Sequence, residues 1–118
     1  MNLTSPSQVK AWCIESGFHP NRTLGQNFLI DRNVLDAIVS LSGVTAGQRV
    51  LEVGAGLGVL TEALLAAGAQ VTAVEKDVRL ADRLAGALGE PSALRVLAAD
   101  ALELDLDVLL AERFDACV

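Results

Sequence analysis

Three glycines and the acidic residues around them are the part of this sequence best suited to chemistry. The stretch LEVGAGLGVL places Gly54, Gly56 and Gly58 two residues apart, with Glu52 just before them. Glycine allows a sharp turn and lets a ligand approach the backbone more closely than a Cβ permits. Glu75 follows 21 residues after Gly54, where a carboxylate can bind the hydroxyls of a ribose. The spacing therefore predicts a nucleotide-binding turn.

The glycine spacing and the nearby acids favour one class of cofactor over another. Dinucleotide enzymes use G-x-G-x-x-G, whereas this chain reads G-A-G-L-G-V, so its third glycine comes one residue early. A carboxylate at Glu52 would repel a pyrophosphate but suits the positive charges of S-adenosylmethionine. Asp100, after a third apolar run, could accept a hydrogen bond from an adenine amino group. Together these acids predict an S-adenosylmethionine site and disfavour an NAD-dependent oxidoreductase.

The elements that must position these residues alternate between strands and helices. We expect strands at 49–53, 69–75, 93–100 and 114–118, and helices at 59–68 and 78–89. The inward faces of the two helices should carry Leu60, Leu64 and Leu65, and Leu80, Leu84 and Leu88. This order is typical of parallel βαβ units with right-handed crossovers. The sequence thus predicts an α/β fold.

Upstream of the glycine turn, the sequence predicts two helices joined by a polar loop. The first contains Val9, Trp12 and Cys13 at helical spacing and stops at Gly17. The second has Asp31 as its N-cap and ends near Gly43. Its apolar face is expected to comprise Val34, Leu35, Ile38, Val39 and Leu41. We divide the chain into an N-terminal helical and loop segment, 1–45, and a Rossmann-like part, 46–118.

Charge and composition limit the functions open to the chain. Its formal net charge is −6 over 118 residues, which argues against this segment alone being a nucleic-acid binder. Four basic residues fall in the N-terminal part, where either an ordinary solvated surface or a mildly basic arm would account for them: Lys10, His19, Arg22 and Arg32. No apolar run approaches the roughly 18 residues of a membrane helix, and there is no signal pattern, so we expect a cytoplasmic protein.

The two cysteines, Cys13 and Cys117, lie far apart and form no CxxC pair. We therefore expect two buried free thiols and no metal site.

Four stretches together resemble a known family. LGQNFL (residues 24–29), LEVGAGLGVLT (51–61), VEKD (74–77) and AADALELDL (98–106) resemble the ribosomal RNA small-subunit adenine N6-dimethyltransferases, over about residues 10–118. The resemblance implies a Rossmann-like class I S-adenosylmethionine-dependent methyltransferase fold, with a parallel sheet and helices on both faces. It also implies dimethylation of two adjacent adenines in small-subunit rRNA, a role in ribosome biogenesis, and the immature 30S particle as partner.

The resemblance also implies a set of cofactor-binding residues. The LGQNFL loop would cover the cofactor, the glycine turn would pass under its methionine part, and the two strand-end segments would bind ribose and adenine. The residues implied are Gln26, Asn27, Leu29, Glu52, Gly54, Gly56, Glu75, Lys76, Asp100 and Ala101.

The sequence departs from the family's pattern at its last residue. In the family the fourth strand leads into Asn-Leu-Pro-Tyr, which grips the flipped target adenine, whereas this chain ends at Val118. We therefore expect an N-terminal part of such an enzyme, inactive alone and without catalytic residues of its own. Exposed sheet edges and faces would favour self-association.

Two alternatives within RNA biology stay open. A macrolide-resistance methyltransferase acting on large-subunit rRNA shares the same motifs. A non-catalytic RNA-binding assembly factor could have kept the fold without the chemistry.

Overall fold

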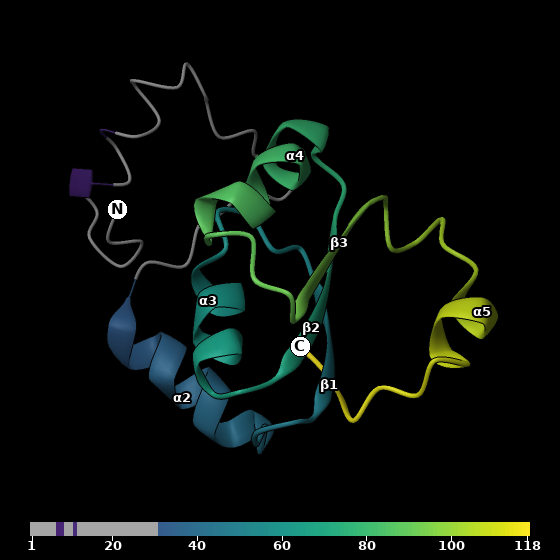
Figure 1. Ribbon diagram of the computed structural model, residues 1–118, viewed down its shortest axis with the longest axis horizontal. Coiled ribbons are helices and arrows are strands. Elements are labelled where there is room, and N and C mark those ends of the chain that lie inside the picture. The colour runs from purple at the N-terminus through teal and green to yellow at the C-terminus, as the bar shows by residue number, and fades with distance from the viewer. Residues whose placement is uncertain (1–6, 9–10, 12–30) are drawn as a thin grey trace.

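The computed structural model describes Ser7, Gln8, Ala11 and residues 31–118, with the backbone alone described for Leu106 and Leu110 (Figure 1). The three isolated N-terminal residues are helical, in agreement with the first expected helix. The rest of that helix and the LGQNFL loop lie outside the described residues. The elements are α2 (Arg32–Ser42), β1 (Arg49–Val53), α3 (Val59–Ala66), β2 (Gln70–Glu75), α4 (Val78–Ala87), β3 (Leu94–Ala98), α5 (Leu106–Leu110) and β4 (Ala116–Cys117).

The four strands form one parallel sheet in the order β3-β2-β1-β4. The chain moves outward from β1 through β2 to β3, then crosses back and adds β4 on the other side of β1. The direction of winding therefore reverses between β1 and β4. In open α/β sheets, ligands bind at such a switch point, beyond the carboxyl ends of the strands. The predicted α/β, Rossmann-like fold is confirmed.

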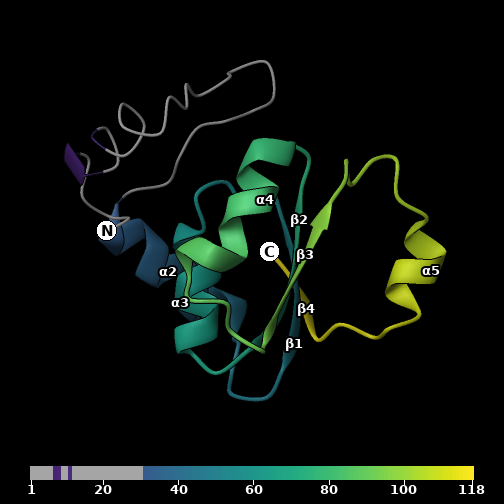
Figure 2. The same cartoon turned by 45° about the horizontal axis from the view of Figure 1, so that its top comes forward.

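Helices cover both faces of the sheet. Figure 2 shows α2, α3 and α4 on one side and α5 on the other. Because side chains alternate along a strand, β1, β2 and β3 each contribute to two cores. The core under α3 and α4 contains Val50, Leu64, Val71, Ala73 and Leu84, and the core under α5 contains Leu51, Val74 and Leu109 with Phe114 packed against them. None of the described helices is long and apolar enough to cross a lipid bilayer.

The second helix begins and ends where the sequence predicted, but its buried face is narrower. Asp31 Oδ1 accepts the Asn33 N–H at 2.8 Å, and Gly43 closes the helix in the left-handed conformation, with φ of 69°. Leu35 is buried, whereas Val34 and Leu41 are 45% and 87% exposed. The expectation that both lie on the packed face was wrong. Among the described elements, α2 packs mainly on α3.

The short helix α5 was not predicted. Asp105 caps it by accepting the Asp107 and Val108 N–H groups, and Leu109 anchors it on the sheet. Five residues are too few to display a helical period.

The prediction of buried thiols was wrong for Cys117, which is free and exposed. The residues on either side of it, Ala116 and Val118, pack toward the α3 and α4 core, so alternation turns Cys117 to the other face. Cys13 lies outside the described residues.

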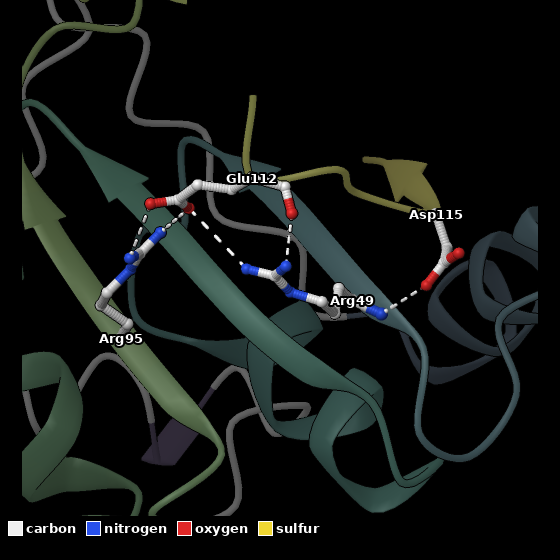
Figure 3. A network of polar contacts seen from close by, with 4 residues as sticks. All are labelled: Arg49, Arg95, Glu112 and Asp115. Carbon is white, nitrogen blue, oxygen red and sulfur yellow. Dashed lines mark hydrogen bonds and ion pairs between the residues drawn. The ribbon is translucent and has the colours of Figure 1, made fainter. Parts of the chain in front are cut away.

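A polar network joins the segment before β4 to the starts of two other strands (Figure 3). The Glu112 carboxylate accepts hydrogen bonds from Arg95 and lies 3.9 Å from the Arg49 guanidinium. Arg49 also donates to the Glu112 carbonyl oxygen. The Arg49 backbone N–H donates to Asp115 Oδ2 at 2.8 Å. The network therefore holds β4 in place at the amino ends of the strands, whereas the glycine turn lies at their carboxyl ends.

Candidate cofactor-binding site

The three glycines of the turn between β1 and α3 serve different purposes. Gly54, Gly56 and Gly58 have φ values of 77°, 58° and 93°, which L side chains rarely adopt. A Cβ at Gly58 would lie 2.6 Å from a Leu84 methyl group, whereas a Cβ at Gly54 would meet nothing within 4 Å. Gly58 thus permits α4 to pack against the turn, and Gly54 leaves bare backbone exposed at the strand end.

Glu75, the last residue of β2, ties the glycine turn to the start of α4. Its side chain is buried. Oε1 accepts the Gly56 N–H at 2.9 Å, and Oε2 accepts the Asp77 N–H at 3.0 Å. A carboxylate has about four acceptor sites. Glu75 can therefore hold the turn and still accept hydrogen bonds from a ligand's hydroxyl groups.

Glu52 lies on the α3 side of β1, with a relative exposure of 2%. The Thr61 hydroxyl donates a 2.6 Å hydrogen bond to its Oε2. Burial raises the pKa of Glu52 from 4.5 to about 7, opposed by the hydrogen bond from Thr61 and reinforced by the negative charge of Glu75. Glu52 is therefore partly protonated near neutral pH, which the sequence did not indicate.

The third acidic residue, Asp100, lies two residues beyond the end of β3. Its Oδ1 accepts the Leu102 N–H at 2.9 Å, which leaves Oδ2 for another donor. The Ala99 N–H donates to the Glu75 carbonyl at 3.1 Å, so this turn lies beside the end of β2. Ala101 packs against the core under α5.

The structure brings most of the predicted residues to one edge of the sheet. The glycine turn follows β1, Glu75 is the last residue of β2, and Asp100 follows β3. These three strands are parallel neighbours, and Lys76 is exposed next to Glu75. Gln26, Asn27 and Leu29 lie outside the described residues. The part assigned to each residue in binding a cofactor stays a prediction.

Two buried polar residues of this region were missed by the sequence reasoning. Thr61 supports Glu52, and Asp77 caps α4 by accepting the Arg79 N–H at 2.9 Å and pairs with the Arg79 guanidinium at 2.8 Å. A lone hydroxyl in the first turn of an apolar helix was the available signal for Thr61. For Asp77 the signal was an acid directly before a helix.

Comparison with known proteins agrees with this arrangement. Residues 17–117 match the family described as ribosomal RNA adenine dimethylase. Ribosomal RNA small subunit methyltransferase A of Deinococcus radiodurans is 47% identical over 109 residues, which cover 92% of this chain and 37% of that protein. The chain thus spans little more than a third of that relative.

Two solved structures show the same similarity. A dimethyladenosine transferase from Plasmodium falciparum has a TM-score of 0.63 at 29% identity, covering 74% of this chain and 30% of that one. The 23S rRNA methyltransferase ErmE has a TM-score of 0.61 at 37% identity, covering 66% and 32%. With the match to the family extending over nearly its whole length, the chain belongs to the ribosomal RNA adenine dimethylase family.

Proposed function

We propose that this chain is the cofactor-binding part of an S-adenosylmethionine-dependent rRNA adenine N6-dimethyltransferase. One observation carries the proposal in particular: the buried Glu75 carboxylate lies at the end of β2 and is hydrogen-bonded to the backbone of the glycine turn. Such a carboxylate, next to bare backbone at a topological switch point, suits a ribose bound against the sheet edge. Membership of the family supports methylation of rRNA as the reaction.

The residues present fit the proposed cofactor. A Cβ at Gly54 would meet nothing within 4 Å, so the bare backbone there is open to the methionine part. In this proposal Glu75 accepts hydrogen bonds from the ribose hydroxyls, and Asp100 accepts one from the adenine amino group. The positive charge of the cofactor would offset the negative charges of these carboxylates. No basic side chain of the protein is needed for that purpose. The proposed contacts are Gln26, Asn27, Leu29, Glu52, Gly54, Gly56, Glu75, Lys76, Asp100 and Ala101.

The bound cofactor would supply an electrophilic methyl group on a sulfonium centre. Displacement at such a methyl asks little acid or base chemistry of the protein. The chain's own contribution is to orient the cofactor, through the rigid turn that Glu75 and Gly58 hold in place, and to keep anionic oxygens near its positive charge. In this proposal the glycine turn contributes to catalysis by holding the cofactor in a fixed orientation.

The RNA target, the cellular location and the biological role are proposed for a protein as long as the relatives. We propose that it dimethylates two adjacent adenines of small-subunit rRNA in the immature 30S particle, in the cytoplasm, as a step in ribosome biogenesis. The small-subunit methyltransferase name of the relative from Deinococcus radiodurans supports this choice.

A large-subunit rRNA adenine methyltransferase is the second candidate, favoured by the 37% identity to ErmE. Methylation of purified 30S and 50S particles by the full-length protein separates the two. Methylation confined to 23S rRNA would refute the first candidate. A folded protein that binds either particle and methylates neither would be the non-catalytic assembly factor.

Calorimetric titration with S-adenosylmethionine tests the cofactor site in the chain as it is. We expect binding, and we expect Glu75→Gln to weaken it at least about tenfold because a hydrogen bond to a charged group is lost. Glu62→Gln, an exposed acid on α3, is the matched control and should bind normally. NADH binding without S-adenosylmethionine binding would contradict the proposal.

A further inference from the structure

The pair formed by Glu52 and Thr61 lies between the two elements that the glycine turn connects, β1 and α3. Thr61 is 0% and Glu52 2% exposed, and the hydroxyl and carboxyl oxygens are 2.6 Å apart. This separation is typical of a hydrogen bond strengthened by charge. A valine has nearly the shape of threonine and would fill the space without burying a polar group. Packing alone therefore gives no reason for the hydroxyl.

The electrostatic surroundings of Glu52 are unfavourable to its negative charge. Burial and the charge of Glu75 both raise its pKa, and the Thr61 hydrogen bond is the opposing influence. On the described elements around it, Glu62 of α3 is exposed, and Asp77 before α4 is paired with Arg79. No described cation stabilises Glu52. A positively charged ligand at the glycine turn would do so.

We propose that Thr61 is a positioning residue of the cofactor site: its hydroxyl fixes the Glu52 carboxyl beside the glycine turn and stabilises the anion that a cationic cofactor requires. The inference rests on the proposed function, because it takes the cofactor to carry a sulfonium charge.

The chemistry of the hydroxyl explains why threonine suits this role. A hydroxyl has one proton to donate, and a carboxylate accepts it more strongly than a neutral carboxylic acid does. The β-branched side chain restricts the rotamers of Thr61 on the helix. The donor is therefore held in place before any ligand arrives.

The first test needs no cofactor. Carbon-13 NMR follows the Glu52 carboxyl carbon against pH in the wild type, Thr61→Val and Thr61→Ser, with Glu52→Gln assigning the resonance. We expect the titration midpoint in Thr61→Val to rise by about one pH unit and that in Thr61→Ser to stay near the wild type. Thr61→Ala replaces Thr61→Val should the latter not fold. Equal midpoints with and without the hydroxyl would overturn the inference.

The second test uses the cofactor and its counterpart without the sulfonium charge. S-adenosylhomocysteine lacks the sulfonium charge, so its binding should depend less on Glu52. We expect Thr61→Val to weaken S-adenosylmethionine binding about tenfold at pH 6.5 and much less at pH 8.5, with Thr61→Ser restoring it. Thr72→Val is the matched control, since Thr72 is buried on the opposite face of the sheet. The same pH profile in Thr61→Val as in the wild type would overturn the inference.

The two measurements separate failure of the inference from failure of the proposed function. Unchanged NMR midpoints, together with normal S-adenosylmethionine binding, would remove the role of Thr61 and leave the cofactor site standing. A shifted midpoint in a chain that binds no S-adenosylmethionine at any pH would refute the cofactor site, and with it the role of Thr61 toward a cofactor.

Discussion

At the scale of single residues, the site rests on two buried carboxyl groups whose surroundings differ. The Glu75 carboxylate accepts hydrogen bonds from two backbone N–H groups. The Glu52 carboxyl accepts one from the Thr61 hydroxyl and is repelled by the negative charge of Glu75. The residue types and the spacing located both acids on the sequence. Their difference could not be predicted, because it depends on which groups the fold places within hydrogen-bonding distance.

The raised pKa of Glu52 makes stability depend on pH. The folded state binds the proton more tightly than the unfolded chain, so this contribution is intact below pH 4.5 and is lost as pH rises toward 7. The loss amounts to about 3 kcal/mol. Urea unfolding at pH 5 and pH 8 should show it as a difference between the wild type and Glu52→Gln. A constant difference across this range would contradict the assignment.

At the scale of elements, strand prediction succeeded for the first three apolar runs, which pair over most of their length with neighbouring strands. The strand at 49–53 was predicted with the bounds it has, and those at 69–75 and 93–100 to within two residues. The last strand was predicted as five residues but comprises Ala116–Cys117. Strand length at a sheet edge is set by pairing with a neighbour, which the sequence does not display. The α5 helix was missed for a different reason, because its five residues are too few to display a helical period.

The glycine turn offers a matched pair of substitutions. Gly58→Ala places a Cβ in strained backbone and against Leu84, so we expect it to destabilise the fold by at least about 2 kcal/mol. Gly54→Ala meets open space and should cost about 1 kcal/mol while blocking the proposed cofactor surface. Thermal unfolding and S-adenosylmethionine titration measure the two effects. Equal stability losses would show that the Leu84 contact is unimportant.

The network around Glu112 should behave as exposed charges do. Arg95 and Arg49 lower the pKa of Glu112, so its contribution to stability is present above the ordinary range of a glutamate and is lost as pH falls through its lowered value. We expect Glu112→Gln to lower the melting temperature slightly in low salt and not at all in 1 M salt. A salt-independent decrease would indicate a packing role instead.

At the scale of the whole molecule, the two faces of the sheet are covered unequally. Helices α3 and α4 cover one face, while the other has the short α5, with Val53 48% exposed and Cys117 exposed. The expected self-association stays a prediction, and this face and the β4 edge are where we expect it to occur.

The exposed Cys117 thiol of β4 allows contact between two copies of the chain to be tested by oxidation. We expect the chain to form disulfide-linked dimers on mild oxidation, because Cys117 is free and exposed. Light scattering and non-reducing gels would detect them, and Cys117→Ser should abolish them. Dimers that persist in Cys117→Ser would implicate Cys13.

The fastening of β4 also determines when that strand can form. The hydrogen bond from the Arg49 amide to Asp115 closes a separation of 66 residues, whereas β1 and β2 are joined through one short helix. Long closures cost more chain entropy, so β4 should dock after the β1-β2-β3 unit has assembled. The same strand would be the first to detach in the native state, and its backbone amides should exchange with deuterium ahead of those of β2. We therefore expect β4, the strand that creates the switch point, to dock last during folding and to detach first from the native sheet.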